Sequence, residues 1–294
     1  MNDLNTSPAE DDIDFDRRFG GIARLYGDQA LARFRGAHIC VIGVGGVGSW
    51  AVEALARSAV GRLTLIDLDN VAESNINRQI QALTGTIGMA KITALTQRIA
   101  QINPYCQVTE IEDFVTPDNL DEMIGGHDYD YVLDAMDSAR AKTALVHYCR
   151  MNKIPLIVIG SAGGQTDPTR IEVRDLAKTE QEPLLKKVRR RLRGQFNYPA
   201  NGKNKLGVDA VFSMEPLKFP ETGEVCSVDG DELAAAAQKP GLTGINCAGF
   251  GSAMVVTATF GMVAAGHILR KLAGETETEA ETAAQADASP APGA

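Results

Sequence analysis

Apolar runs of strand length alternate with amphipathic segments along the first 160 residues. Runs rich in Val, Ile and Leu predict strands at 39–42, 62–66, 106–111, 129–137 and 154–160. Apolar positions at helical spacing predict helices at 49–59, 88–103, 116–124 and 139–152. Such an alternation of strands and helices forms a mostly parallel sheet with helices on both faces. The predicted fold class is therefore α/β, a Rossmann-like doubly wound sheet.

The pattern changes after Ser161, where a smaller C-terminal β/α extension is expected. Residues 170–176 predict a strand that starts a second layer, residues 182–194 a basic helix, and residues 210–215 a short strand. Residues 221–244 contain an alanine run and predict a flexible excursion.

The nearly uncharged segment 245–269 is long enough to span a bilayer. Its small residues, and the absence of a flanking aromatic belt, favour a helix buried inside the domain, with membrane association as the alternative. No secretory apolar segment stands at the N-terminus, and none of the five cysteines forms a CxxC pair. We expect a cytoplasmic protein with free thiols. A redox or sulfur-relay role for Cys226 or Cys247 stays open.

The two ends of the chain carry much of its negative charge. Residues 1–16 hold six acidic residues and residues 274–294 hold five, without Lys or Arg in either segment. We expect disorder at 1–16 and 273–294, and one domain over 17–272 that begins with short helices packed on the sheet. Outside the ends, 27 of the 38 acidic residues remain against 29 Lys and Arg, so the charge does not exclude a nucleic-acid partner.

A glycine-rich turn follows the first predicted strand, in the sequence AHICVIGVGGVG at residues 37–48. A turn of this kind lets the backbone approach phosphates, and the following helix offers free N–H groups and a partial positive charge. Asp67 ends the next strand, about 20 residues later, where a carboxylate accepts hydrogen bonds from ribose hydroxyls. The spacing predicts a nucleotide site at the first turn of the sheet.

The loop after Asp67 is dense in polar residues, as expected at the ligand-binding edge of an open α/β sheet. Lys91 falls in the first turn of the next helix, where a cation opposes the helix dipole and a bound anion would explain it. Asp137 ends the fourth predicted strand. The predicted nucleotide-binding residues are Gly43, Gly45, Gly46, Gly48, Asp67, Asp69, Ser74, Asn75, Arg78, Gln79, Lys91, Asp137 and Ser138.

The strings GVGGVGSW, LIDLDNVAESNINRQ, GMAK and LDAMDS resemble the adenylating domain of the ubiquitin-activating-enzyme-like adenylyltransferase superfamily. The strings RFGGIARLYG, AGGQTDPT, DLAKT, KLGVDAVFS and GFGSAMVVTATFG are similar to one branch, the tRNA threonylcarbamoyladenosine dehydratases. The resemblance covers about residues 17–270. It implies ATP-dependent adenylation of the threonylcarbamoyl carboxylate on a tRNA adenosine, release of AMP and closure of the side chain with net loss of water, a ligase-type reaction.

The resemblance also implies roles for individual residues. Arg78 and Lys91 neutralise phosphate charge, Asp137 holds Mg²⁺ at the phosphates of ATP, and Asp67 binds the ribose. The family places an N-terminal arginine in the active site of a homodimer partner, and Arg17, Arg18 and Arg24 are the candidates in this chain.

Three alternatives stay open in the sequence. An adenylyltransferase for a small ubiquitin-like sulfur-carrier protein shares the ATP site, although its CxxC zinc ligands are absent, and a sulfur-relay or cysteine-desulfurase system is a candidate partner. An NAD-dependent oxidoreductase and a non-catalytic nucleotide-binding protein explain the glycines alone. The basic helix favours tRNA, because clustered cations bind phosphates. Its candidate tRNA-binding residues are Lys186, Lys187, Arg189, Arg190 and Arg193.

Overall fold

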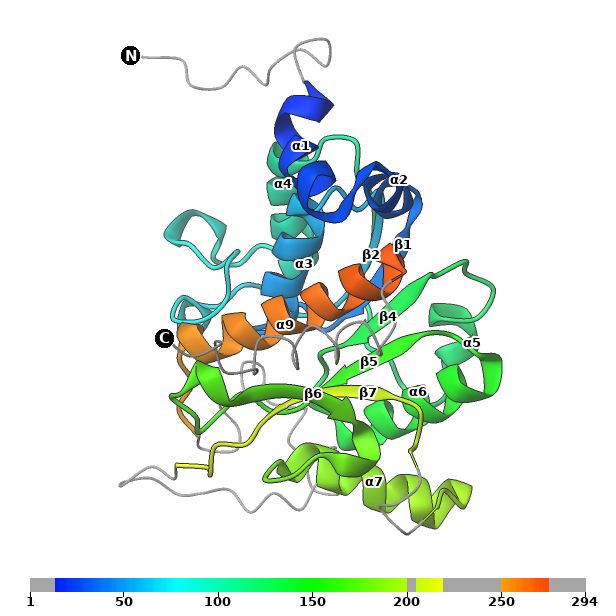
Figure 1. Cartoon of the computed structure of the whole chain (residues 1–294). Coiled ribbons are helices and arrows are strands. Elements are labelled where there is room, and N and C mark those ends of the chain that lie inside the picture. The colour runs from blue at the N-terminus through cyan, green and yellow to red at the C-terminus, as the bar shows by residue number, and fades with distance from the viewer. Residues whose placement is uncertain (1–13, 200–204, 219–249, 275–294) are drawn as a thin grey trace, which may run out of the picture.

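The computed structural model describes residues 14–199, 205–218 and 250–274 (Figure 1). Its strands are β1 (His38–Ile42), β2 (Arg62–Ile66), β3 (Gln107–Ile111), β4 (Tyr131–Asp134), β5 (Leu156–Ile159), β6 (Ile171–Asp175) and β7 (Asp209–Ser213). Its α-helices are α1 (Phe15–Tyr26), α2 (Asp28–Gly36), α3 (Gly48–Arg57), α4 (Lys91–Ile102), α5 (Leu120–Met123), α6 (Ala139–Asn152), α7 (Pro183–Phe196) and α9 (Met254–Ala273).

All the strands belong to one sheet, in the order β3-β2-β1-β4-β5-β7-β6. Every neighbouring pair is parallel except β6 with β7. The chain first moves outward from β1 to β2 and β3, and then returns to β4 on the other side of β1. The carboxyl ends of β1 and β4 therefore form a topological switch point, the usual ligand-binding crevice of such sheets. The predicted α/β class is confirmed.

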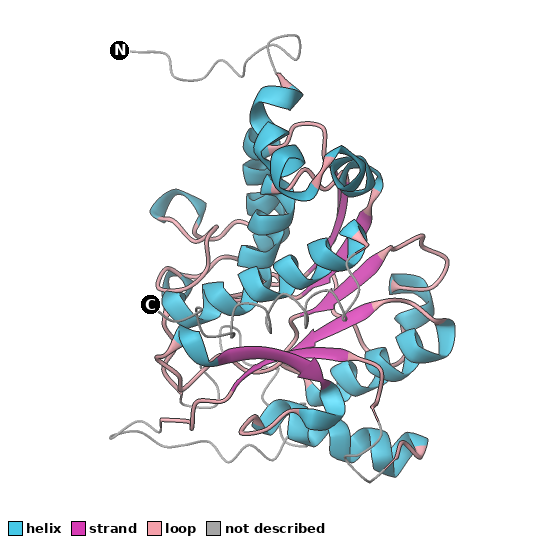
Figure 2. Ribbon diagram, in the orientation of Figure 1, coloured by secondary structure: helices cyan, strands magenta, loops and turns pink. Residues whose placement is uncertain are grey.

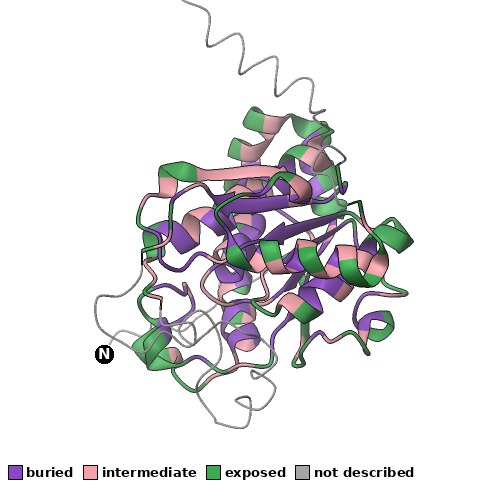
Figure 3. Cartoon of the chain, turned by 90° about the horizontal axis from the view of Figure 1, so that it is seen from below, coloured by how far each residue is buried: buried purple, intermediate pink, exposed green. Residues whose placement is uncertain are grey.

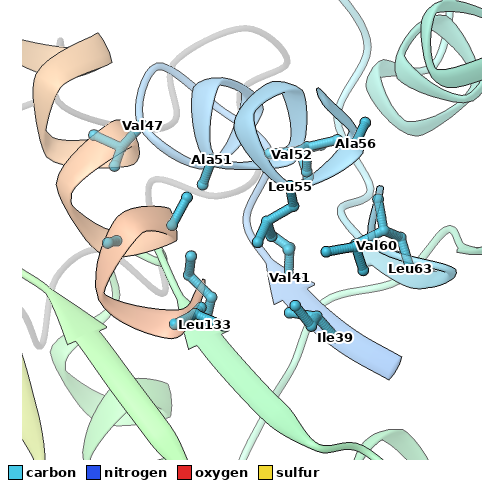
Figure 4. Packing of buried hydrophobic residues seen from close by; sticks show 14 of the residues in the cluster. Ile39, Val41, Val47, Ala51, Val52, Leu55, Ala56, Val60, Leu63 and Leu133 are labelled. Atoms are coloured by element: carbon cyan, nitrogen blue, oxygen red, sulfur yellow. The ribbon is translucent and has the colours of Figure 1, made fainter. Parts of the chain in front are cut away.

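Alternate residues of the strands pack against different helices. Figure 2 shows helices on both sides of the strands. Ile39 and Val41 belong to a buried cluster with α3, α4 and α9, and Figure 4 shows the α3 residues lying over these two strand positions. Cys40 and Ile42 belong to a second cluster with α5, α6 and α7. The inner strands of the sheet are accordingly buried in the middle of the molecule, whereas the edge strands β3 and β6 are partly exposed (Figure 3). Each fully buried aliphatic side chain contributes about 1.5–3 kcal/mol to folding.

The strand expected to open a second layer does not do so. Residues Ile171–Asp175 form β6, which lies at the edge of the same sheet and pairs antiparallel with β7. The extension after Ser161 therefore widens the main sheet, and α7 connects its last two strands. Sequence alternation defines a strand but not its partner, because pairing depends on contacts distant in sequence.

Helix α9 begins at Met254, later than expected from the uncharged segment 245–269, of which residues 245–249 lie outside the described part. It packs against α3 so closely that a Cβ atom at Gly261 would lie 2.4 Å from the carbonyl oxygen of Val47. One face of the helix is buried, as predicted, but Met254, Val255 and Met262 are exposed. Among the described residues, no helix combines the length and apolarity needed to cross a membrane.

The chain ends differ from the expected boundaries. Helix α1 begins at Phe15, with Asp14 as its N-cap, so residues 14–16 belong to a helix and not to a disordered segment. The short helices α1 and α2 are confirmed, and α1 packs mainly on α2, with Ile22 against the cluster that includes strand residues such as Ile39. The helix expected at 116–124 is shorter, at Leu120–Met123. The predictions for 1–13, 221–244 and 275–294 concern residues outside the described part.

Candidate active site

The glycine turn lies at the carboxyl end of β1 and begins α3. Gly43 has a φ of +82°, and a Cβ atom there would lie 3.1 Å from the carbonyl group of Ala135. At Gly48 a Cβ atom would lie 1.9 Å from the carbonyl oxygen of Gly43. Only glycine fits these positions. Helix α3 has no side-chain cap at this end. Its Ser49 amide donates to the Gly45 carbonyl oxygen at 3.2 Å, so the turn continues directly into the helix. The partial positive charge of the helix N-terminus beside the turn fits a phosphate group.

Asp67 joins the glycine turn to the polar loop that follows β2. Its Oδ2 accepts a hydrogen bond from the Val44 amide at 2.8 Å, and its Oδ1 accepts one from the Asp69 amide at 2.9 Å. The side chain is buried, and this burial raises the pKa of its carboxyl against the opposing charge of Lys91. Each oxygen keeps a further lone pair, so the carboxylate still suits a ribose hydroxyl.

Lys91 is the first residue of α4 and only 6% exposed. Its Nζ lies 2.7 Å from Asp69 Oδ2 and 3.7 Å from Asp67 Oδ1. These two carboxylates already compensate a cation at the helix N-terminus, so a bound anion is not needed to explain it. In the structure the ammonium group is therefore held by two carboxylates. To bind a phosphate, it would have to leave its contact with Asp69.

Arg78 is held rigidly within the same loop. Its Nη1 donates to the carbonyl oxygen of Ser74 at 2.7 Å and to Asn77 Oδ1 at 2.9 Å. The indole of Trp50 donates to the Arg78 carbonyl at 2.8 Å, and the arginine stem lies against Gly46. Burial lowers the pKa of Arg78, but a guanidinium stays protonated in proteins. The result is a fixed positive charge beside the glycine turn.

The amide side chains support the two loops from inside. Asn75 Oδ1 accepts from the Ala72 amide at 3.0 Å. Gln79 Oε1 accepts from Gln81 Nε2 at 3.1 Å, and the same nitrogen donates to the carbonyl oxygen of Val44 at 2.9 Å. Gln81 is a residue that the sequence interpretation missed. Its position two residues after Gln79 carries no signal, because its role depends on a partner in the glycine turn.

Asp137 stands three residues beyond the end of β4, and Ser138 accepts from the Ala141 amide as the N-cap of α6. The Asp137 side chain is exposed on one side, while the protein around it excludes enough water to raise the pKa of its carboxyl, with the charge of Asp69 adding to the rise. Within the described residues no three potential ligands cluster around a metal position. Mg²⁺ bound to nucleotides commonly takes only one or two carboxylates, so this donor set fits it.

The basic helix is confirmed as α7, with Glu182 as its N-cap. Leu185, Val188 and Leu192 bury one face, while Lys186 and Arg190 are exposed one turn apart. Two other cations of the helix, Arg189 and Arg193, make hydrogen bonds within the protein. Arg189 is half-buried and donates to Thr179 Oγ1, and Arg193 Nε donates to the carbonyl oxygen of Pro199 at 3.3 Å.

Two aromatic side chains at the end of α7, Phe196 and Tyr198, pack against His147. Phe196 stacks on His147 with 3.9 Å between ring centroids, and Tyr198 packs edge-on against the same histidine. Both rings are partly buried against the core. Packing within the protein therefore engages both rings.

The three N-terminal arginines all lie exposed on α1. Arg18 Nη1 is engaged within its own chain, donating to the carbonyl oxygens of Gln101 at 3.3 Å and Ile102 at 3.0 Å. Arg17 and Arg24 lie seven residues apart, on one face of the helix. Cys226 and Cys247 fall outside the described residues, whereas Cys40, Cys106 and Cys149 are free thiols as expected.

Comparison with known proteins identifies the family. A model described as the ThiF family matches residues 18–290. This chain belongs to the ThiF family. Within the family it falls in the branch of the tRNA threonylcarbamoyladenosine dehydratases. The Escherichia coli (strain K12) protein of that name is 54% identical over 257 residues, which cover 87% of this chain and 93% of the relative.

A solved structure agrees with this placement. The E. coli tRNA N6-threonylcarbamoyladenosine dehydratase in complex with ATP has a TM-score of 0.77 and 49% identity, covering 92% of this chain and 98% of the other. The molybdopterin-synthase adenylyltransferase of Salmonella typhimurium (strain LT2) is 35% identical over only 131 residues, which cover 45% of this chain and 51% of the relative. The family resemblance seen in the sequence is thus confirmed, and the dehydratase branch is favoured over the sulfur-carrier branch.

Proposed function

We propose that this ThiF-family chain is an ATP-dependent dehydratase that adenylates the carboxylate of threonylcarbamoyladenosine in tRNA and closes it into a cyclic form. One observation carries the proposal. The glycine turn, Asp67, Lys91 and Arg78 meet at the switch point of the sheet, in a chain 54% identical to a tRNA threonylcarbamoyladenosine dehydratase. The first assigned step is attack of the carboxylate on the α-phosphate, with pyrophosphate as the leaving group.

The residues divide the work of that step between them. The glycine turn and the first amides of α3 bind the phosphates, and Asp67 accepts from the ribose. The carboxylate and the phosphates are both anions, so the reaction needs positive charge beside them, which Arg78 supplies from a fixed position and Lys91 supplies once its ammonium turns from Asp69 toward the phosphates. Asp137 would hold Mg²⁺, which neutralises the phosphate chain when bound. The loops that carry these groups are fixed by further polar residues, namely Asp69, Ser74, Asn75, Gln79 and Ser138.

Two assemblies follow from the same proposal. The exposed cations of α7 bind the phosphate backbone of tRNA, and the most exposed of them are Lys186 and Arg190. The active enzyme is a homodimer in the cytoplasm, where its tRNA substrate resides, and Arg17 or Arg24 of one protomer reaches the site of the other.

The deciding experiment is mass spectrometry of nucleosides from modified tRNA after incubation with the purified protein and ATP. We expect loss of one water from threonylcarbamoyladenosine, with one AMP formed per cyclised residue. If the nucleosides stay unchanged and the protein instead adenylates a small carrier protein with ATP, its function would be that of a sulfur-carrier adenylyltransferase.

A further inference from the structure

Lys142 is a completely buried cation behind the site. It lies on α6, and both Lys142 and Asp134 have side chains with 0% exposure. The Lys142 Nζ lies 2.7 Å from Asp134 Oδ1 and also donates to the main-chain oxygen of Asp134 at 3.1 Å. An isolated buried ammonium is very unfavourable, whereas an apolar pair of similar volume is often as stable as a buried ion pair, so stability alone gives no reason for a charged pair here.

The ion pair lies where β4 ends and the loop to Asp137 begins. Asp134 Oδ1 also accepts from the Met136 amide at 3.0 Å, so the turn is fixed through its first residue. The glycine turn packs on this same peptide, since a Cβ atom at Gly43 would lie 3.1 Å from Ala135 and 3.2 Å from the Met136 nitrogen. Any shift of the turn would move Asp137 and the glycine turn together.

Glu182 extends the arrangement to the next strand. Its Oε1 accepts from the Ser161 amide at 2.9 Å, after β5, and its two oxygens accept from the Leu184 and Leu185 amides at the start of α7. Burial raises the pKa of both Asp134 and Glu182, and the ammonium of Lys142 opposes the rise in each carboxyl.

We propose that Lys142 is a positioning residue for the adenylation step. Through Asp134 it fixes the turn that carries Asp137 and that packs against the glycine turn. Glu182 fixes the neighbouring Ser161 loop and the start of α7. The inference rests on the proposed function. A displacement of about 1 Å in such a frame is enough to cost a reaction about 100-fold, without loss of ground-state binding.

The test compares Lys142→Met, Asp134→Asn and the double variant, each as the full chain. Thermal unfolding and steady-state AMP formation with ATP and modified tRNA are measured. Lys142→Met alone should melt at a much lower temperature, because it leaves Asp134 buried without its counter-charge. The double variant removes both charges and should recover most of the melting temperature, while kcat stays about 10- to 100-fold below wild type and KM for ATP is close to wild type. The exposed Lys153→Met, on the C-cap of the same helix, is the control.

A double variant that regains both its melting temperature and wild-type kcat would show that the pair serves folding alone, which overturns the inference. If the double variant does not fold, Asp134→Asn decides, because it keeps one acceptor oxygen for Lys142 and the Met136 amide while the charge is lost and the second oxygen becomes an amide nitrogen. Wild-type kcat in folded Asp134→Asn overturns the inference, and reduced kcat at unchanged KM for ATP supports it. Failure of the proposed function is separate, since wild-type protein would then form no AMP with tRNA.

Discussion

Arg78 combines two properties that rarely meet in one residue, since it is buried and yet lies beside a turn built to accept phosphates. Its hydrogen bonds to Ser74 and Asn77 fix the guanidinium before any ligand arrives. We expect Arg78→Ala to raise the activation barrier of AMP formation by about 3–4 kcal/mol, the usual effect of losing preorganised charge. Steady-state kinetics with ATP and tRNA measure this.

The control for Arg78 is Arg78→Lys, which keeps the charge but replaces the planar guanidinium, whose Nη1 donates to both Ser74 and Asn77, by a compact ammonium. It should lie between wild type and Arg78→Ala in kcat. A wild-type kcat in Arg78→Ala, with folding intact, would remove the guanidinium from the reaction.

Asp137 is exposed and makes no packing contribution comparable to that of Arg78. Asp137→Ala should therefore unfold at the wild-type temperature and form little or no AMP, because the phosphate chain of ATP would keep its repulsion for an anionic nucleophile. Turnover is followed across a Mg²⁺ series. A variant with unchanged Mg²⁺ dependence and near wild-type turnover would contradict the assignment of Asp137.

At the scale of residues, the sequence predicts those positions whose chemistry is fixed by local spacing. The glycine turn and Asp67 belong to this group, because strand, turn and acid follow one another at set intervals. Lys142, Glu182 and Gln81 do not, since each acts on a partner in another strand or loop. A buried lysine on an amphipathic helix looks like a surface charge until its face is known.

At the scale of elements, Glu53 of α3 connects this helix to α4. Arg98 donates to both of its oxygens, at 2.6 and 3.0 Å, and Arg57 donates at 2.7 Å. Burial favours the neutral form of Glu53, but the bonds from Arg98 and Arg57 outweigh this and lower the pKa of its carboxyl below the ordinary 4.5. The stabilisation is therefore complete above about pH 4.5 and is lost as the pH falls through the lower, folded-state pKa.

We expect Glu53→Gln to lower the free energy of unfolding by about 1–3 kcal/mol at pH 7, since a charged acceptor is lost from a buried position. The difference from wild type should shrink as the pH falls below about 4.5, because protonation weakens the same bonds in the wild-type protein. Urea unfolding at several pH values measures it. Glu112→Gln, at an exposed position, is the control, and a difference that is constant down to pH 3 would disprove the charge-based account.

Helix α7 carries the prediction on tRNA. Replacing Lys186, Arg190 and Arg193 together by Ala should raise KM for tRNA and reduce its dependence on salt, because fewer counterions are released on binding. ATP affinity should not change. Arg189 is left in place, since its contact with Thr179 makes a loss of stability the expected result of removing it. The control replaces the exposed Lys153 and Arg270 by Ala and so removes positive charge elsewhere on the surface. If both variants show equal tRNA kinetics across a salt series, the tRNA docking site does not lie on α7.

The elements themselves were predictable where apolar periodicity was strong, as in β1 to β5 and α7. The pairing of β6 was not, because its antiparallel partner β7 lies more than 30 residues later in the chain. The first residue of α9 was not predictable either. The run of small apolar residues before Met254 contains no capping signal, and the helix begins without a side-chain cap.

At the scale of the whole molecule, apolar side chains gather beside the candidate site. Met254, Val255 and Met262 of α9 are 45%, 51% and 41% exposed, and Ile76 of the polar loop is 46% exposed. The loop and the start of α9 are in contact, since Asn77 Nδ2 donates to the carbonyl oxygen of Ser252 at 3.0 Å. Exposed apolar surface of this kind favours contact with another protein surface.

We expect this surface to form the homodimer contact, which would bring the second copy close to the loop that carries Arg78. Val255→Asp together with Met262→Asp should convert the dimer to a monomer, because the burial of two carboxylates opposes association. Light scattering measures the mass, and AMP formation should fall with it if an arginine of the partner completes the site. Met151→Asp, at a 68% exposed position on α6, adds the same charge elsewhere and should stay dimeric. Wild-type protein that is monomeric and fully active at working concentration would refute both the contact and the shared site.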